Sequence, residues 1–167
     1  KLRRYGMGEI CAKMAEEYPF ALLTSKSRYR LHSQLDSTAS NLFANVEDRE
    51  PVWMHPDAAK KLGLKSGDIA KVTSRRGSGL AGVIVTDRIR PDTVVIHHGG
   101  WYSPEEPGEE GTLDVHGCDN VLTIDIPSSK LSCGNVANST QVKIERWDDE
   151  LDPIMAHVQP KTVRADD

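Results

Sequence analysis

The chain of 167 residues has 38% hydrophobic residues, 13 Gly, 9 Pro and a formal net charge of −4, which fits one turn-rich domain and argues against a helical bundle. Its acidic residues are dispersed and it has no basic field, so the composition excludes the electrostatic footprint of a nucleic-acid-binding protein. No apolar run approaches the length of a membrane span, no signal peptide opens the sequence, and the three cysteines form no disulfide framework.

The first third of the chain predicts a short helix, one strand and a long polar loop. Residues 8–17 can form the helix, and the apolar run at 20–24 is too short for a helix and predicts a strand. Residues 25–50 are polar and irregular, and a loop of that length in a compact domain is usually functional or disordered. Loops rich in Arg, His, Ser, Gln, Asn and Gly, carried on a β core, suit recognition of a large polar ligand.

The sharpest local signals lie in the middle of the chain. Pro56 occupies the first turn of a short predicted helix, and Gly63 supplies its stop. Alternation of apolar and polar residues then predicts two strands joined by a hairpin centred on residues 77–79, with Val72 and Val83 in the core. The expected elements, in order, are a strand at 52–54, a helix at 56–62, and strands at 69–74, 80–86 and 93–97.

The last third predicts two more strands, at 121–126 and 141–146, followed by a tail. Beyond Trp147 the chain is rich in Asp and Pro with little apolar content, so we expect it to wrap around the domain or to fray. Strands at this spacing, with one very short helix, predict a small β-barrel. The expected organisation is a lead-in from a preceding domain at 1–17, a barrel at 18–147 and a C-terminal tail at 148–167.

The densest cluster of hydrogen-bonding side chains lies in the long polar loop. Arg30 offers a planar fork of donors, His32 a ring nitrogen and Gln34 a paired donor and acceptor, with Ser33 beside them. This cluster can recognise a polar ligand. The alternative is a solvated loop of Arg and Ser.

A second cluster follows the strand at 93–97. Because adjacent histidines on a strand point to opposite faces, His97 and His98 are not expected to clamp one metal ion. We expect a strand end with a glycine bend, in which His97 is structural and Trp101 and Tyr102 form an aromatic plug. Gly99 and Gly100 can instead permit close approach of the backbone to a ligand.

A third cluster comprises Asn120 and the loop at 132–138. Asn120 precedes a predicted strand, where a carboxamide can close an Asx turn or read a base-like edge. Cys118 and Cys133 are interpreted as small buried residues. A zinc site built on His116 and Cys118 would need two further ligands, which the sequence does not place.

Three sequence blocks, in the same order, resemble the C-terminal dinucleotide-binding domain of the dimethyl sulfoxide reductase family of molybdenum enzymes. They are YRLHSQLDST, the stretch from PVWMHPDAAKKLGLKSGD to VVIHHGGWY, and NVLTIDIPSSKLSCGNVANST. The resemblance covers roughly residues 18–147 and is strongest to dimethyl sulfoxide, trimethylamine N-oxide and biotin sulfoxide reductases. It implies a mainly β fold with short helices, a six-stranded double-psi β-barrel.

The resemblance also implies a cofactor. Family members hold molybdenum between two molybdopterin guanine dinucleotides, which this domain helps to bind without enclosing them. The protein ligand of the metal lies in an earlier domain, so neither a catalytic residue nor a metal ligand is expected here. The candidate cofactor-binding residues are Arg30, His32, Ser33, Gln34, Gly99, Gly100, Asn120, Gly134, Asn135 and Asn138.

The implied activity belongs to a larger parent protein. It is oxygen-atom transfer from an S-oxide or N-oxide, with the other domains completing the cofactor site and a cytochrome or iron–sulfur subunit supplying electrons. The parent is expected in the periplasm, as relatives commonly are.

Two alternatives use the same barrel. One is a non-redox binding module similar to protein-interaction domains of unfoldases. The other is a stand-alone molybdopterin-binding small subunit similar to that of formylmethanofuran dehydrogenase. The joint presence of the LHSQ and NVLT blocks disfavours the first, and a start at Lys1 without Met disfavours the second.

Overall fold

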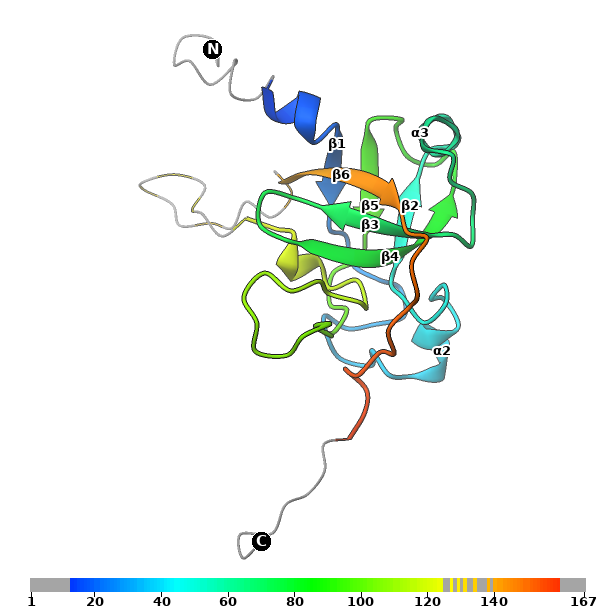
Figure 1. Cartoon of the computed structure of the whole chain (residues 1–167), viewed down its shortest axis with the longest axis vertical. Coiled ribbons are helices and arrows are strands. Elements are labelled where there is room, and N and C mark those ends of the chain that lie inside the picture. Colours follow the sequence, from blue (N-terminus) through cyan, green and yellow to red (C-terminus); the bar gives the residue numbers. More distant parts are fainter. Residues whose placement is uncertain are drawn as a thin grey trace, which may run out of the picture.

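The computed structural model describes residues 13–124, 127, 129, 131, 134, 138 and 140–159. Six strands close into a single barrel in the order β1–β5–β2–β4–β3–β6 (Figure 1). The strands are β1 (Phe20–Leu23), β2 (Pro51–Met54), β3 (Ile69–Thr73), β4 (Ser78–Val85), β5 (Thr93–Ile96) and β6 (Thr140–Arg146). The helices are α2 (Ala39–Leu42), α3 (Pro56–Leu62) and the 3₁₀ turn η2 (Asp119–Val121), and residues 13–17 are also helical.

The barrel mixes parallel and antiparallel pairs. β1 pairs in parallel with β5, and β2 in parallel with β4, each across a long connection. The four other neighbouring pairs are antiparallel. These two parallel pairs within one closed sheet agree with a double-psi barrel, so the predicted fold class is confirmed.

Apolar side chains from the strands fill the interior of the barrel. Val72 on β3 and Val83 on β4 are both fully buried, as predicted. Leu22, Val52 and Val94 come from three further strands and are equally inaccessible. Burying a side chain of this size stabilises the fold by about 1.5–3 kcal/mol, so the barrel interior is the main source of stability.

Local signals place α3 where the sequence predicts it. The ring of His55 accepts a hydrogen bond from the Asp57 N–H at 3.1 Å, and Pro56 fills the first turn. Gly63 ends the helix with a φ of 68°, a left-handed conformation that favours glycine.

The predicted centre of the β3–β4 hairpin is wrong by a few residues. Thr73 pairs with Ser78, and the Ser74 N–H donates to the Gly77 carbonyl, so the turn spans residues 74–77 and is centred on Arg75 and Arg76. Gly79 lies inside β4, where an added Cβ would approach Asp114 Oδ2 to 3.3 Å. This glycine permits close packing inside a strand and does not form the turn.

The strand predicted at 121–126 is also wrong for its described part. Residues 121–124 continue η2 into a bend, and Leu122 enters the barrel core from this turn with 2% of its surface exposed. A short apolar run has the same composition in a buried turn as in a strand, so its packing decides the structure.

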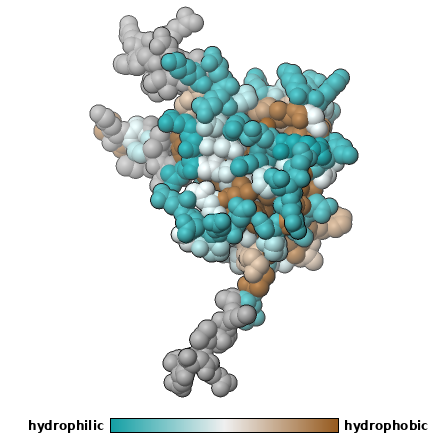
Figure 2. Space-filling model, in the orientation of Figure 1, coloured by the Kyte–Doolittle hydropathy of each residue, from teal (hydrophilic) through white to brown (hydrophobic). Residues whose placement is uncertain are grey.

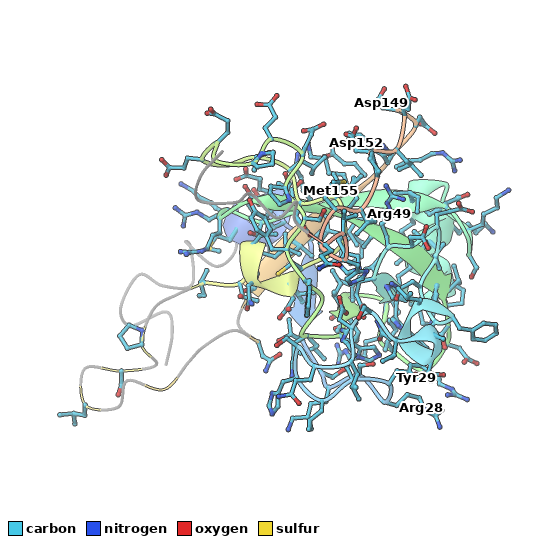
Figure 3. All side chains as sticks on the ribbon, turned by 90° about the horizontal axis from the view of Figure 1, so that it is seen from below. Arg28, Tyr29, Arg49, Asp149, Asp152 and Met155 are labelled. Atoms are coloured by element: carbon cyan, nitrogen blue, oxygen red, sulfur yellow. The ribbon has the colours of Figure 1, made fainter. Side chains whose placement is uncertain are left out.

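Residues 147–159, the described part of the segment after β6, run along the outside of the barrel, one of the two outcomes expected for this segment (Figure 1). The Trp147 N–H donates to the Ile69 carbonyl, and Leu151 and Ile154 pack on a small apolar cluster that includes Leu113. Arg49 donates to the Asp152 carbonyl. The side chains of Arg49, Asp152 and Met155 are labelled in Figure 3. The described part of this segment, residues 147–159, is called the tail below.

The face of the molecule seen in Figure 2 is largely hydrophilic, with smaller apolar patches between the polar side chains. Across the part of the chain that the structure describes, none of the helices has both the length and the apolar character to cross a membrane.

Candidate functional site

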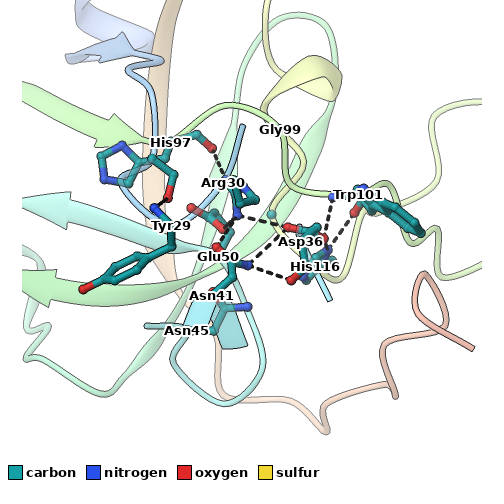
Figure 4. A network of polar contacts seen from close by, with 12 residues as sticks. Tyr29, Arg30, Asp36, Asn41, Asn45, Glu50, His97, Gly99, Trp101 and His116 are labelled. Carbon is teal, nitrogen blue, oxygen red and sulfur yellow. Dashed lines mark hydrogen bonds and ion pairs between the residues drawn. The ribbon is translucent and has the colours of Figure 1, made fainter. Parts of the chain in front are cut away.

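Arg30 is the centre of a buried polar network that joins the 25–50 loop to the end of β5 (Figure 4). Its guanidinium donates to Asp36 at 3.0 Å, to Asn41 at 3.2 Å and to Glu50. It also donates to the carbonyls of His97 and His98, both at 3.1 Å. Burial raises the pKa of Glu50 above its ordinary value, although the bond from Arg30 opposes this shift.

The residues expected to read a ligand therefore divide into two groups. Arg30 is buried and both of its terminal guanidinium nitrogens bond within the protein, so here it positions loops. His32 and Ser33 instead line a cavity of about 320 Å³ together with Gly99 and Asn120. We call this the His32 cavity; its lining is completed by Thr24, His98 and Asp119.

The walls of the His32 cavity are held in place by specific contacts. The rings of His32 and His98 stack with centroids 5.5 Å apart. The indole N–H of Trp101 donates to the Ser33 carbonyl at 2.6 Å, while 42% of the Trp101 surface remains exposed. Trp101 and the half-exposed Tyr102 are thus not the aromatic plug that the sequence predicted; Trp101 anchors the loop instead.

Gly99 allows the loop that contains His32 to pack closely against the backbone that follows β5. Its φ is 101°, and an added Cβ would lie 2.0 Å from the His32 carbonyl oxygen. Its N–H donates to Asp119 Oδ1 at 3.3 Å, and burial raises the pKa of Asp119 above its ordinary value. Close backbone approach was predicted for this glycine, and the structure shows that the chain's own His32 loop makes such an approach.

Asn138, from the loop at 132–138, does not line the His32 cavity but contacts Thr24, which does. Its side-chain oxygen accepts from the Thr24 N–H at 2.9 Å and lies 3.3 Å from the Thr24 hydroxyl oxygen. The lining of the cavity itself runs from Thr24 to Asn120, so residues about a hundred positions apart meet there. Of the other predicted residues in this loop, Gly134 is exposed and Asn135 falls outside the described residues.

Gln34 and Gly100 lie near the His32 cavity without lining it. The backbone of Gln34 pairs with that of Leu31, and its side chain is exposed. Gly100 is buried, and its position for a Cβ is 3.3 Å from the Gly117 carbonyl oxygen. A cofactor contact by either residue stays a prediction.

Adjacent histidines line different cavities, as their alternation on a strand predicts. His98 faces the His32 cavity, and His97 lines a second cavity of about 380 Å³. The His97 Nδ1 lies 3.0 Å from the Ser25 hydroxyl, and burial lowers the pKa of His97 below its ordinary value. The two histidine rings therefore line separate cavities.

The second cavity, which the sequence analysis did not identify, is lined by several basic and aromatic side chains. They include Lys26, Arg28, Arg88, Tyr29, Trp53 and His97. The indole nitrogen of Trp53 and the side-chain oxygen of Asn45 are buried there without a hydrogen-bond partner among the described residues. The sequence signal was the basic and aromatic run that contains Arg28 and Tyr29, which lie together in Figure 3.

Comparisons with known proteins identify the family of this chain. A family model described as "Molydopterin dinucleotide binding domain" matches residues 20–141. The trimethylamine-N-oxide reductase of Haemophilus influenzae is 45% identical over 156 residues, which are 93% of this chain and 19% of that protein. The dimethyl sulfoxide/trimethylamine N-oxide reductase of Rhodobacter capsulatus is 39% identical over 145 residues, 87% of this chain and 18% of that protein.

A solved structure supports the fold. Acetylene hydratase from Pelobacter acetylenicus superposes with a TM-score of 0.64 at 21% identity, over 81% of this chain and 19% of that one. The chain thus spans about a fifth of the length of the relatives it matches. Because the family model covers most of the barrel and the curated relatives align over most of the chain, the protein belongs to the molybdopterin dinucleotide-binding domain family, homologous to trimethylamine N-oxide and dimethyl sulfoxide reductases.

Proposed function

We propose that this chain is the cofactor-binding C-terminal domain of a molybdenum oxidoreductase that reduces S-oxides or N-oxides by oxygen-atom transfer. Its relatives are named as reductases of trimethylamine N-oxide and dimethyl sulfoxide. The observation that carries the proposal is the His32 cavity, where three segments distant in sequence present polar side chains to one space.

The chemistry of the His32 cavity fits a molybdopterin guanine dinucleotide. Such a ligand has fused heterocycles with many donors and acceptors, a pyrophosphate and a guanine. The side chains of His32, Ser33 and Asn120 have no hydrogen-bond partner among the described residues, so their polar atoms are available to it. These side chains are exposed, so a ligand that covers them must replace their bonds to water, and each polar group it left unpaired would cost about 1–3 kcal/mol. A ligand with many donors and acceptors can meet that requirement.

The residues of this chain would bind and orient the cofactor. Asn120 offers a donor and an acceptor on one carboxamide, and the stacked rings of His32 and His98 offer an aromatic surface beside them. Arg30 would not contact the cofactor but would hold the 25–50 loop against the end of β5 through its bonds to the His97 and His98 carbonyls. The bound molybdenum supplies the redox chemistry, and the protein supplies orientation and exclusion of water.

The remaining parts of the function would lie outside this chain. Other domains of the parent protein would provide the metal ligand and the rest of the cofactor site, and an external cytochrome or iron–sulfur subunit would supply electrons. We propose a periplasmic location for the parent protein on the basis of its similarity to these reductases.

The proposal is tested by Asn120→Ala in the full-length parent protein. We expect cofactor affinity to fall by about 1–3 kcal/mol because the lost bonds are to the ligand and not to the core. The measurement is molybdenum per polypeptide together with the guanine nucleotide released on denaturation. Asn45→Ala is the matched control, because Asn45 lines the second cavity. Full retention of metal and nucleotide by a folded Asn120→Ala protein would show that this assignment is wrong.

A further inference from the structure

We propose that Asp36, His116 and His157 form a binding site for a divalent transition-metal ion of the zinc class. Each residue offers one ligand atom, and the three atoms lie within 4.8 Å of one another. Asp36 comes from the 25–50 loop, His116 from the loop between β5 and η2, and His157 from the tail. The inference uses only side chains of this chain and does not depend on the proposed function.

Asp36 is already oriented as a metal ligand would be. Its Oδ1 accepts a bond from Arg30 at 3.0 Å, which fixes the plane of the carboxylate. Its Oδ2 faces His157 Nε2 at 2.7 Å and also accepts from the Trp101 N–H at 3.3 Å. The Asp36 side chain is fully buried, so water does not compete strongly for Oδ2.

His116 provides the second, independent observation. Its Nδ1 lies 2.7 Å from the Trp101 carbonyl oxygen, which can only accept, so Nδ1 carries the hydrogen and the lone pair of the neutral ring is on Nε2. The ring is fully buried, and Nε2 has no hydrogen-bond partner among the described residues. Metal-binding histidines usually donate their other ring N–H to a carbonyl or carboxylate in this way.

A metal ion bound through His116 Nε2 would satisfy a group that the hydrogen bonds leave unpaired. It would require the ring to turn Nε2 toward Asp36, because Nδ1, at 3.9 Å, is the nitrogen nearer to Asp36 Oδ2. The bond between Asp36 and His157 uses those two side chains but leaves His116 Nε2 without a partner. Two imidazoles and one carboxylate are a donor set that zinc accepts, with the fourth position open to water. The rings of His116 and His157 already meet edge to face with centroids 5.0 Å apart.

Such an ion would fasten the tail to the barrel. His157 is 121 residues from Asp36 in sequence, and the other tail contacts include the Met155 N–H bond to Ser103 at 3.0 Å. Because the ion would bind three segments that are together only in the folded state, it should raise the temperature of unfolding.

The test uses the full 167-residue chain after treatment with a chelator. ZnCl2 is titrated in by calorimetry, and CoCl2 by visible absorption, which reports nitrogen and oxygen ligands directly. We expect one equivalent of metal to bind, a tetrahedral cobalt spectrum and a higher unfolding temperature. Absence of binding by the original chain would overturn the proposal.

Three variants locate the ion. His157→Gln, in which the amide can still donate to Asp36, and His116→Gln should each weaken binding at least tenfold and abolish the cobalt spectrum. His55→Gln is the control, because His55 forms a separate pair with the exposed Asp57 at 3.6 Å. Unchanged affinity in both cluster variants, or an equal loss in His55→Gln, would assign any bound ion to other histidines and refute the site.

Discussion

Gly99 controls how closely the end of β5 approaches the His32 loop. In Gly99→Ala the new methyl group would meet the His32 carbonyl, and the backbone would keep a φ of 101°, so we expect a loss of about 2–5 kcal/mol in unfolding free energy. Gly108→Ala is the matched control, because Gly108 has a φ of 94° and no atom within 4 Å of its Cβ position. Urea denaturation of both variants measures the difference. Equal losses would mean that the contact with His32 is not tight.

Individual site residues could be predicted from sequence only in part. His32, Ser33 and Asn120 carry the right chemistry, and the fold brings them to one cavity. Arg30 carries the same chemistry, but its guanidinium is used by Asp36 and Glu50 inside the protein. Composition does not reveal such pairing, because it depends on how the loop folds back on β5.

At the level of the elements, β2 tests whether the barrel interior is the main core. Met54 ends this strand and is fully buried, so Met54→Ala should lower the unfolding free energy by about 2–5 kcal/mol through lost burial and a residual cavity. Met155→Ala, with 55% of its surface exposed, should change it by no more than about 0.5 kcal/mol. Chemical denaturation gives both values. A Met54 loss as small as that of Met155 would contradict this assignment of the core.

Elements with short-range signals were predictable and those fixed by distant contacts were not. α3 has its cap, its proline and its final glycine within nine residues, so its bounds could be read directly. η2 has no comparable local signal, and Leu122 is buried only because the barrel lies beside it. The error in the position of the hairpin has the same origin. Gly79 is required by its close packing against Asp114, which comes from another loop, and not by the turn.

For the molecule as a whole, the size of the chain predicts that it is catalytically silent by itself. It spans 19% of its relative from Haemophilus influenzae, and the metal ligand and most of the cofactor site are expected in other domains. We expect no reduction of dimethyl sulfoxide or trimethylamine N-oxide by the purified chain with a reduced dye, measured against buffer. The full-length parent protein is the positive control. Turnover by the chain alone would contradict the proposal that other domains supply the metal ligand and most of the cofactor site.

The order of strands in the closed barrel also bears on how the chain folds as it leaves the ribosome. β3 and β4 are neighbours both in sequence and in the sheet, so their hairpin can form early. β1 pairs with β5 and β6, and Phe20 lies opposite Val142, so the first strand must wait until almost the whole barrel has been synthesised. Such distant pairing carries a large loop-closure cost and slows folding. Until β6 closes the ring, the nascent chain has free strand edges, and this is the stage at which it is most exposed to pairing with other chains.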